Sequence, residues 1–136
     1  MKFTPYLNFK FTCAEAFAFY EKLFGGKITF MMSHGDSPMA GEMPAEWHSA
    51  VMHATLEIKG QTIQGADAPG DWYQTPAGFA VIIELEDEAE ADRIFTALVE
   101  GGFEKMAMAE TFWAKRFGMC TDRFGTPWMI NVPKPM

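Results

Sequence analysis

Polar and hydrophobic positions alternate with a period of two near the start of the chain, in residues 5–11, PYLNFKF. A period of two sends successive side chains to opposite faces of a strand, so the pattern predicts a half-buried β-strand. Its apolar face carries Leu7, Phe9 and Phe11, and its other face carries Tyr6, Asn8 and Lys10.

The spacing changes to that of a helix directly after this strand. Thr12 and Glu15 stand three residues apart, the capping-box arrangement in which both side chains bond to free amides of the first turn. Gly25 and Gly26 end the segment, because glycine accepts the left-handed C-terminal turn without a Cβ clash. An amphipathic helix is predicted between them, with an apolar stripe of Ala16, Phe19, Tyr20, Leu23 and Phe24.

The same plan recurs in residues 79–102. An apolar strand leads to Asp87, which lies 75 positions after Thr12, and Glu90 again follows three residues later. A second helix is predicted, and Gly101-Gly102 ends it. Its apolar stripe is formed by Ala91, Ile94, Phe95, Leu98 and Val99. Because cap, stripe and stop coincide in the two segments, the chain is predicted to be an internal duplication.

Each predicted helix is followed by segments that alternate and turn at a glycine. Residues 28–32 predict a short strand, and residues 53–67 and 118–131 each predict two strands joined by a turn. Each half therefore reads β-α-β-β-β, with a seam in the Pro- and Gly-rich residues 67–78.

The predicted fold class is α+β, a single domain of two tandem βαβββ modules, about residues 1–72 and 73–136. Neither sheet can bury its face alone, so we expect the two to form an incomplete barrel with a concave cleft, each half covered outside by its helix. Residues 33–48 form a long loop with two prolines and two methionines. Loops of this length are usually lids, binding segments or interface arms.

Composition and charge narrow the classes of function. The 136 residues are 49% hydrophobic and carry a net charge of −7 with no basic run, which argues against nucleic acid as a partner. No apolar stretch approaches the roughly 20 residues of a membrane span, and the start does not resemble a signal peptide. Cys13 and Cys120 have neither metal-site nor disulfide spacing, so we expect buried thiols in a reducing compartment and a cytoplasmic protein.

Three segments resemble the PhnB-like branch of the vicinal oxygen chelate superfamily. They are YLNFKFTCAEAFAFYEKLFGG near the start, MHATLEIKGQTI in the middle and FWAKRFGMCTDRFGTPWMI at the end. The tandem βαβββ plan is that of this superfamily, which includes glyoxalase I, bleomycin-resistance proteins and extradiol dioxygenases. Members commonly read Asp-Pro-Phe-Gly-His where this chain has Arg123 and Thr126 at the second and fifth positions.

The branch is often labelled demethylubiquinone-methyltransferase-like. Methyl transfer requires a site for the methyl donor, and the sequence contains no glycine-rich strand-loop-helix to hold a nucleotide-like donor. The label therefore does not by itself predict that activity.

Catalytic members of the superfamily hold a divalent ion with His, Glu or Gln from the first and last strands of each half. The resemblance places these positions at Pro5 or Tyr6, at Ala80 or Val81, at Gln64 and at Met129. Pro, Ala and Val cannot ligate, methionine suits a hard ion poorly, and one glutamine cannot hold an ion alone. We therefore expect no catalytic metal and no cofactor.

Glu84 is the candidate catalytic residue. Alternation places it on the concave side together with Asn8, and Asn131 is a further polar residue nearby. Burial there would raise the pKa of Glu84 toward the range of a general base. Two alternatives remain open: a solvated strand residue without catalytic role, or a weak Mg²⁺ or Mn²⁺ site shared with Gln64.

The three histidines do not have the spacing of a helical metal pair. His34 and His48 are predicted to be surface loop residues. His53 matches a position of the family and lies on a predicted strand near the mouth of the cleft, where it either forms a structural hydrogen bond or contacts a ligand.

The C-terminal segment concentrates rigid, hydrogen-bonding residues. Arg116 and Asp122 are predicted to form a bidentate pair that fastens a hairpin, and the alternative is that Arg116 faces an anionic or carbonyl-bearing ligand. Trp128 is flanked by apolar residues, which favours the core, although it is also a candidate ligand contact. Trp113 is the better candidate for ligand stacking or a dimer contact.

Two main functions follow from these patterns. The first is a metal-free, homodimeric protein that binds a small molecule, and its alternative is a metal-assisted lyase, isomerase or dioxygenase-like enzyme of the same superfamily. A dimeric scaffold whose eleven methionines form adaptable contacts is a third possibility. The candidate ligand-binding residues are Tyr6, Asn8, His53, Gln64, Trp113, Arg116 and Trp128.

Overall fold

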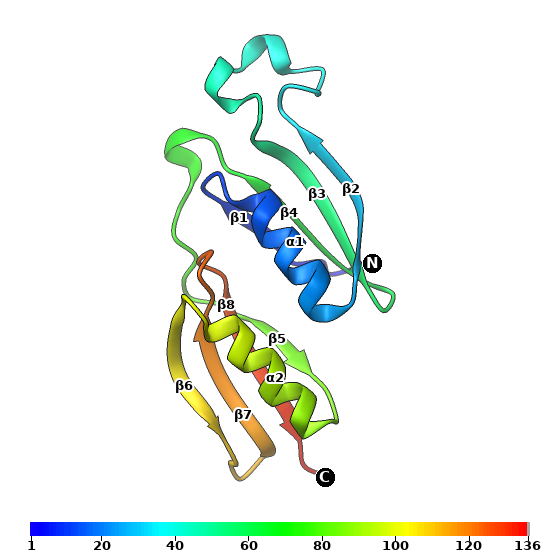
Figure 1. Cartoon of the computed structure of the whole chain (residues 1–136), viewed down its shortest axis with the longest axis vertical. Coiled ribbons are helices and arrows are strands. Elements are labelled where there is room, and N and C mark those ends of the chain that lie inside the picture. The colour runs from blue at the N-terminus through cyan, green and yellow to red at the C-terminus, as the bar shows by residue number, and fades with distance from the viewer. Residues whose placement is uncertain (136) are drawn as a thin grey trace. The chain divides into compact units, whose positions relative to one another are not determined.

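The computed structural model describes residues 1–135, which fold into two compact units. Unit 1 comprises Met1–Gln74 and unit 2 comprises Thr75–Met136, so the boundary lies inside the predicted seam at 67–78. In each unit, one helix lies across one face of a four-stranded sheet (Figure 1). None of the described helices is both long enough and apolar enough to cross a membrane.

Unit 1 has the predicted βαβββ order. Its elements are β1 (Tyr6–Phe9), α1 (Cys13–Phe24), β2 (Lys27–Ser33), β3 (Val51–Ile58) and β4 (Gln61–Asp67). The strands lie in the order β1-β4-β3-β2, with β1 parallel to β4 and the other pairs antiparallel. Three short 3-10 turns, η1 (Ala40–Glu42), η2 (Ala45–Trp47) and η3 (Gly70–Trp72), lie in the connections around β3 and β4.

Unit 2 repeats this topology, which confirms the predicted duplication. Its elements are β5 (Val81–Glu84), α2 (Glu88–Val99), β6 (Phe103–Ala109), β7 (Ala114–Thr121) and β8 (Pro127–Pro133). The strand order is β5-β8-β7-β6, again with a parallel first pair, β5 with β8.

A glycine in a central strand lets each helix approach its sheet closely. A Cβ built on Gly65 of β4 would lie 2.9 Å from the ring of Phe17 on α1, and one built on Gly118 of β7 would lie 2.9 Å from the ring of Phe95 on α2. Real side chains do not tolerate such distances, so an aromatic ring of each helix occupies the space that a side chain would need. The sequence therefore places a small residue opposite a large one in both halves.

The apolar stripe of α1 differs from its prediction. Phe17 is fully buried, whereas Phe19 and Phe24 are only partly covered. The buried residues of α1 are Cys13, Ala16, Phe17, Tyr20 and Leu23, and those of α2 are Ala91, Ile94, Phe95 and Leu98. The helix of unit 1 is thus rotated toward Phe17, the ring that meets Gly65.

The first strand is shorter than the alternation predicted. β1 ends at Phe9, and Phe11 has a φ of 64°, in the left-handed region that bulky residues rarely adopt. The Phe11 side chain is 51% exposed and does not continue the buried face of Leu7 and Phe9. Its ring contacts Trp47 instead, at a centroid distance of 4.2 Å.

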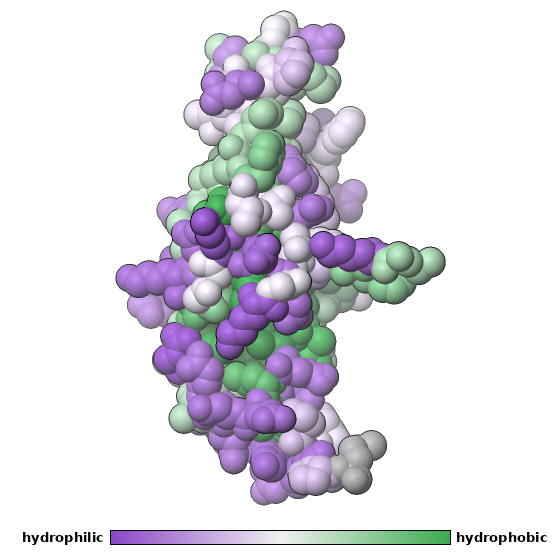
Figure 2. Space-filling model, turned by 90° about the vertical axis from the view of Figure 1, so that its right-hand side faces the viewer, coloured by the Kyte–Doolittle hydropathy of each residue, from purple (hydrophilic) through white to green (hydrophobic). Residues whose placement is uncertain are grey.

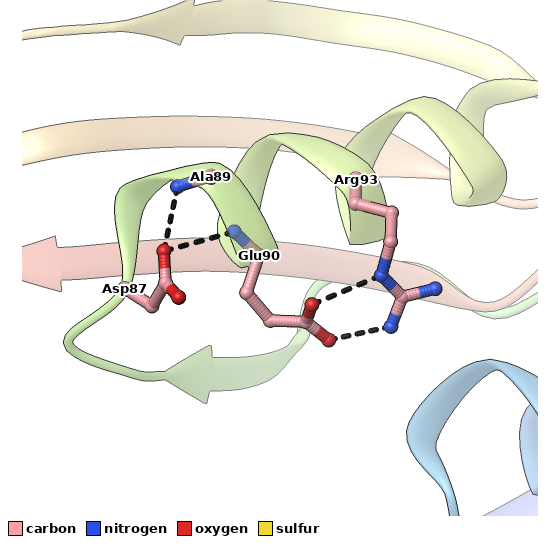
Figure 3. Close-up of polar contacts among 4 residues, drawn as sticks. All are labelled: Asp87, Ala89, Glu90 and Arg93. Atoms are coloured by element: carbon pink, nitrogen blue, oxygen red, sulfur yellow. Dashed lines mark hydrogen bonds and ion pairs between the residues drawn. The ribbon is translucent and has the colours of Figure 1, made fainter.

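The two helices begin in different ways although their sequences predict the same cap. At α2, the Asp87 carboxylate accepts hydrogen bonds from the amides of Ala89 and Glu90 at 2.9 and 3.2 Å. The carboxylate of Glu90, the other residue of the predicted capping box, pairs with Arg93 (Figure 3). At α1, Thr12 makes no capping hydrogen bond with its side chain.

The side-chain acceptor at the start of α1 is Asp67, which satisfies the amide of the first helical residue. Its Oδ1 accepts a hydrogen bond from the Cys13 amide at 3.0 Å, and its Oδ2 accepts one from the Val51 amide at 2.9 Å. The side chain is 3% exposed, so both carboxylate oxygens are satisfied inside the protein. One residue at the end of β4 therefore ties together the start of α1 and the start of β3.

Asp122 has a comparable role in the turn between β7 and β8. Its Oδ1 accepts hydrogen bonds from the amides of Phe124 and Thr126, and its Oδ2 accepts one from the indole Nε1 of Trp128 at 2.9 Å. The predicted pair of Arg116 with Asp122 is wrong. Arg116 points toward α2 and binds Asp92 through Nε and Nη2, at 3.0 and 2.8 Å.

Both cysteines are free and buried, as expected for thiols that form no disulfide. Burial, with Asp67 nearby as a second cause, raises the pKa of the Cys13 thiol far above its usual range. Burial, followed by the charges of Asp122 and Glu104, raises the pKa of Cys120 to about 12. Both thiols are therefore protonated at neutral pH and poor nucleophiles.

The contrast between the two helix starts gives a matched test. Asp87→Ala should lower the free energy of unfolding by about 1 kcal/mol, because two amides of α2 lose their acceptor. Thr12→Ala should change it by less than about 0.5 kcal/mol, because the Thr12 side chain caps nothing. Urea denaturation followed by circular dichroism measures both. Equal losses in the two variants would contradict the assignment of the caps.

Candidate functional site

Unit 1 contains a pocket of ≈370 Å³. This volume is within the range of about 300–1,000 Å³ that is usual for small-molecule sites. The pocket lies where the 34–50 connection, the first strand and the end of β4 meet. Its lining residues are Tyr6, Asn8, His34, Met39, Met43, Met52, Ala66, Asp67, Ala68, Pro69 and Trp72.

Alternation along β1 positions two of the predicted site residues in this pocket. Leu7 and Phe9 are buried on the side of α1, so Tyr6 and Asn8 face the opposite side of the sheet. In the parallel register, Tyr6 lies beside Gln64 and Asn8 lies beside Ala66. Tyr6 and Asn8 line the pocket as the alternation indicated, whereas Gln64 is a neighbour of its wall.

The 34–50 connection is folded over the pocket by backbone contacts between its two ends. The His34 amide donates to the carbonyl of Ala50, and the Gly35 amide donates to the carbonyl of His48, both at 2.9 Å. Trp47 is buried and packs edge-on against the His34 ring at 6.0 Å. The connection is therefore an ordered wall that brings Met39 and Met43 to the pocket.

His34 is not the surface loop residue that the sequence predicted. Its side chain is 9% exposed, and its Nε2 has no hydrogen-bond partner within residues 1–135. The residue is among those that line the pocket, and its Nε2 is itself buried. His48 does lie on the surface, where its Nε2 is 3.0 Å from the carbonyl of Ala40 and 3.2 Å from that of Met43.

His53 belongs to a small polar cluster beside the pocket. Its Nδ1 lies 3.1 Å from the hydroxyl of Tyr6, and its Nε2 lies 3.4 Å from the hydroxyl of Thr55. The rings of His53 and Tyr6 also stack at 5.6 Å. Both ring nitrogens thus have a hydrogen-bond partner, which agrees with the structural alternative for this residue.

The hydroxyl of Tyr6 is protonated at neutral pH. Burial, with the charge of Cys13 as a smaller cause, raises the pKa of Tyr6 above its usual value.

The other predicted site residues lie in unit 2. Trp113 is 42% exposed and packs edge-on against Phe117 at 5.2 Å. Trp128 is 1% exposed, so it belongs to the core and is not available to a ligand. Arg116 is engaged with Asp92, so a direct contact with a ligand would have to compete with that ion pair.

Glu84 does not have the environment that its catalytic role required. It pairs in register with Asn131 on the face of the sheet opposite α2, but its side chain is exposed. The argument for a general base depended on burial, and this condition is not met. The prediction of Glu84 as a catalytic residue therefore loses its physical basis.

The residues at the metal positions of the fold do not provide a set of ligands. The resemblance places these positions at Pro5 or Tyr6 and Gln64 in unit 1, and at Ala80 or Val81 and Met129 in unit 2. In the observed register, Tyr6 lies beside Gln64 and Ile82 lies beside Met129. A phenol, an amide, an alkyl chain and a thioether offer too little negative charge for a hard divalent ion. Among residues 1–135, no three His, Cys, Asp or Glu side chains come together in a metal-binding group.

Sequence reasoning missed most of the pocket. Met39 and Met43 were visible only as members of a long loop, and Met52, Pro69 and Trp72 carried no local signal. The useful clue was the length of the 33–48 segment, because a long connection in a small domain usually has a binding role. Which residues of that segment turn inward depends on the contacts between its two ends.

Comparisons with known proteins agree with this architecture. The model of the family described as 3-demethylubiquinone-9 3-methyltransferase matches residues 1–131. Protein YjdN of Escherichia coli (strain K12) is 35% identical over 142 residues, covering 98% of this chain and 97% of that protein. The crystal structure of protein PA1353 from Pseudomonas aeruginosa is 39% identical and has a TM-score of 0.86, with 96% of each chain covered.

Two further solved structures are similar to this chain, one a PhnB protein and the other a fosfomycin resistance protein. A putative 3-demethylubiquinone-9 3-methyltransferase, PhnB protein, from Bacillus cereus is 27% identical with a TM-score of 0.79, covering 96% of this chain and 98% of that one. The fosfomycin resistance protein FosX from Listeria monocytogenes is 12% identical with a TM-score of 0.67, covering 98% and 93%, and indicates the fold alone. The chain therefore belongs to the PhnB-like 3-demethylubiquinone-9 3-methyltransferase family, with the βαβββ fold of the glyoxalase and bleomycin-resistance type.

Proposed function

We propose that this protein binds a small, largely apolar molecule in the pocket of unit 1 and that it does so without a divalent metal ion. The observation that carries the proposal is the pocket itself, ≈370 Å³ in volume, with methionine, alanine, proline and tryptophan among its walls and few polar groups. Ligand sites commonly have this composition, an apolar lining with a small number of polar anchors.

The exposure of Trp72 supports the same conclusion. This side chain lines the pocket and is 82% exposed, so a large apolar ring faces solvent at the site. A ligand that covers the ring would remove apolar surface from water, which is favourable by roughly 25 cal/mol per Å². Methionine side chains nearby are flexible and polarizable, so they can adapt to ligands of different shape.

The enzyme alternative ranks second because its requirements are not met by the residues present. A metal-assisted reaction on adjacent oxygens needs an ion with open coordination positions, and Tyr6, Gln64, Ile82 and Met129 do not form a suitable set of donors. The proton-shuttle version depends on Glu84, whose side chain is exposed.

Filling the pocket should abolish binding. A panel of neutral aromatic and aliphatic compounds is screened by the rise in thermal midpoint, since a ligand that binds only the folded state stabilises it by mass action. For each compound that binds, Ala68→Leu should weaken the affinity by about tenfold or more, because the larger side chain enters the pocket. Ala14→Leu, an equal change at an exposed position of α1, should leave the affinity unchanged.

The same screen tests the absence of a metal requirement. Binding should be equal with EDTA and with added Mn²⁺, Ni²⁺ or Zn²⁺. Metal-dependent binding that disappears in Gln64→Ala would contradict the proposal, as would compounds that bind Ala68→Leu as tightly as the wild type.

We also infer that the protein is a homodimer that associates through the sheet of unit 2. The face opposite α2 carries a row of apolar side chains in register, Ile82, Met129, Met119 and Met106, and both Ile82 and Met106 are about half exposed. Figure 2 shows hydrophobic residues among hydrophilic ones on the surface that it draws. Exposed apolar surface of this kind commonly marks an interface.

Light scattering at micromolar concentration should give twice the chain mass of 15.3 kDa for the wild type. Ile82→Glu should shift the protein toward 15.3 kDa, because it places a charge in the proposed contact. A wild type that scatters as a single chain would refute the inference.

We also propose that the protein is cytoplasmic. Both cysteines are free, and free thiols are typical of proteins in a reducing compartment.

A further inference from the structure

One polar side chain of the pocket is accessible and has no partner inside the protein. Asn8 lines the pocket, and its side chain is exposed. Its amide group makes no hydrogen bond with another residue in the described part of the chain, residues 1–135. The Asn8 amide is therefore free to bond to a ligand.

The course of β1 and β4 shows that this side chain points toward the pocket. Leu7 and Phe9, the neighbours of Asn8, are buried on the side of α1, so Asn8 points to the opposite face of the sheet. Asn8 pairs in register with Ala66, and the adjacent Gly65 faces α1, so Ala66 lies on the same face as Asn8. Both residues line the pocket, which therefore lies on the face to which Asn8 is directed.

The other polar side chains of the lining have less to offer a ligand. Both carboxylate oxygens of Asp67 accept backbone amides, and the Tyr6 hydroxyl has a hydrogen-bond partner on β3. His34 Nε2 is buried. The indole of Trp72 carries a donor but no acceptor. Asn8 is thus the accessible side chain that offers a donor and an acceptor together.

The chemistry of this amide indicates which ligand group it fits. The NH₂ donor and the oxygen acceptor of an asparagine side chain lie next to each other in one plane. A lactam, a cyclic amide, also presents an N–H and a C=O next to each other, so it can form two hydrogen bonds with Asn8 at once. A ketone, an ether or a ring nitrogen can form only one of the two.

The walls of the pocket indicate a flat and neutral body for the ligand. Tyr6 and Trp72 supply aromatic rings, and the Trp72 ring is 82% exposed. Aromatic rings stack on rings, and the sulfur of the lining methionines makes favourable contacts with ring edges. Among the described residues that line the pocket there is no Lys or Arg to pair with an anion. The Asp67 carboxylate is already bonded to two amides, so it is not free to pair with a cation.

We propose that the ligand is a neutral, flat heterocycle that carries a lactam, and that the lactam forms two hydrogen bonds with the Asn8 amide while the rings lie against Trp72 and the methionines. This assignment rests on the proposed function, because it names the class of ligand for the same pocket. It adds that Asn8 selects the ligand.

Isothermal titration calorimetry with three bicyclic probes tests the assignment. The lactam 2-quinolinone offers the N–H and the C=O, N-methyl-2-quinolinone keeps only the C=O, and quinoline keeps only a ring-nitrogen acceptor. The wild type should bind 2-quinolinone about threefold to tenfold more tightly than either of the other two, because each lacks one hydrogen bond.

Substitutions of Asn8 show whether this residue is the source of the preference. Asn8→Leu removes both polar groups at similar size, so the three probes should bind with equal affinity. Asn8→Val should give the same result with a β-branched side chain that suits a strand, and it decides the question if Asn8→Leu does not fold. Gln61→Leu, the same loss of an amide at an exposed position of β4 outside the pocket, should keep the preference. Circular dichroism and the thermal midpoint verify the fold of each variant.

The possible results distinguish this inference from the proposed function. If the wild type binds the three probes equally and Ala68→Leu binds none of them, the pocket is a ligand site but Asn8 does not select the ligand, and the inference is overturned. It is also overturned if folded Asn8→Leu or Asn8→Val keeps the preference for 2-quinolinone. If no probe binds the wild type, the ligand class is wrong, and the wider compound panel decides whether the pocket is a ligand site at all.

Discussion

The carboxylate of Asp67 is the constraint on which unit 1 and its pocket depend. This one side chain, at the end of β4, accepts the first amide of α1 and the first amide of β3. A carboxylate that is 3% exposed is tolerated only because both of its oxygens are bonded, and losing either donor would leave a buried charge poorly satisfied. Three segments that are distant in sequence are thus held at one point. That point is also a wall of the pocket.

The two units share one scaffold, and they differ in their connecting loops and in the exposed face of the sheet. Both units place an aromatic ring of the helix against a glycine of the sheet, so the packing that defines the fold is shared. Unit 1 has a long connection, residues 34–50, which adds a wall and a pocket. Unit 2 has instead a short β6–β7 connection and an apolar row on its sheet. The shared core therefore leaves each half free to change its outer face.

Local patterns predicted what local physics determines, and they failed where distant contacts decide. The repeat, the two helices and the cap at Asp87 follow from spacing along the chain, and alternation placed Tyr6 on the pocket side. Thr12 has the sequence of a cap, but its side chain caps nothing, and the carboxylate that accepts an amide at the start of α1 belongs to Asp67, 54 residues away. Arg116 shares its hairpin with Asp122 yet faces the helix, and its partner is 24 residues earlier. His34 looked like a surface residue because only the pairing of the two loop ends buries it.

The most direct test of the central claim, that the ligand site is the methionine-lined pocket of unit 1, is methyl NMR of protein labelled at its methionines. The chain has eleven methionines, and they report on both units. Titration with a compound that raises the thermal midpoint in the screen should shift the methyl signals of Met39, Met43 and Met52 and leave those of Met106, Met119 and Met129 in place. Shifts confined to the unit 2 methionines, or no shifts at all, would contradict the account.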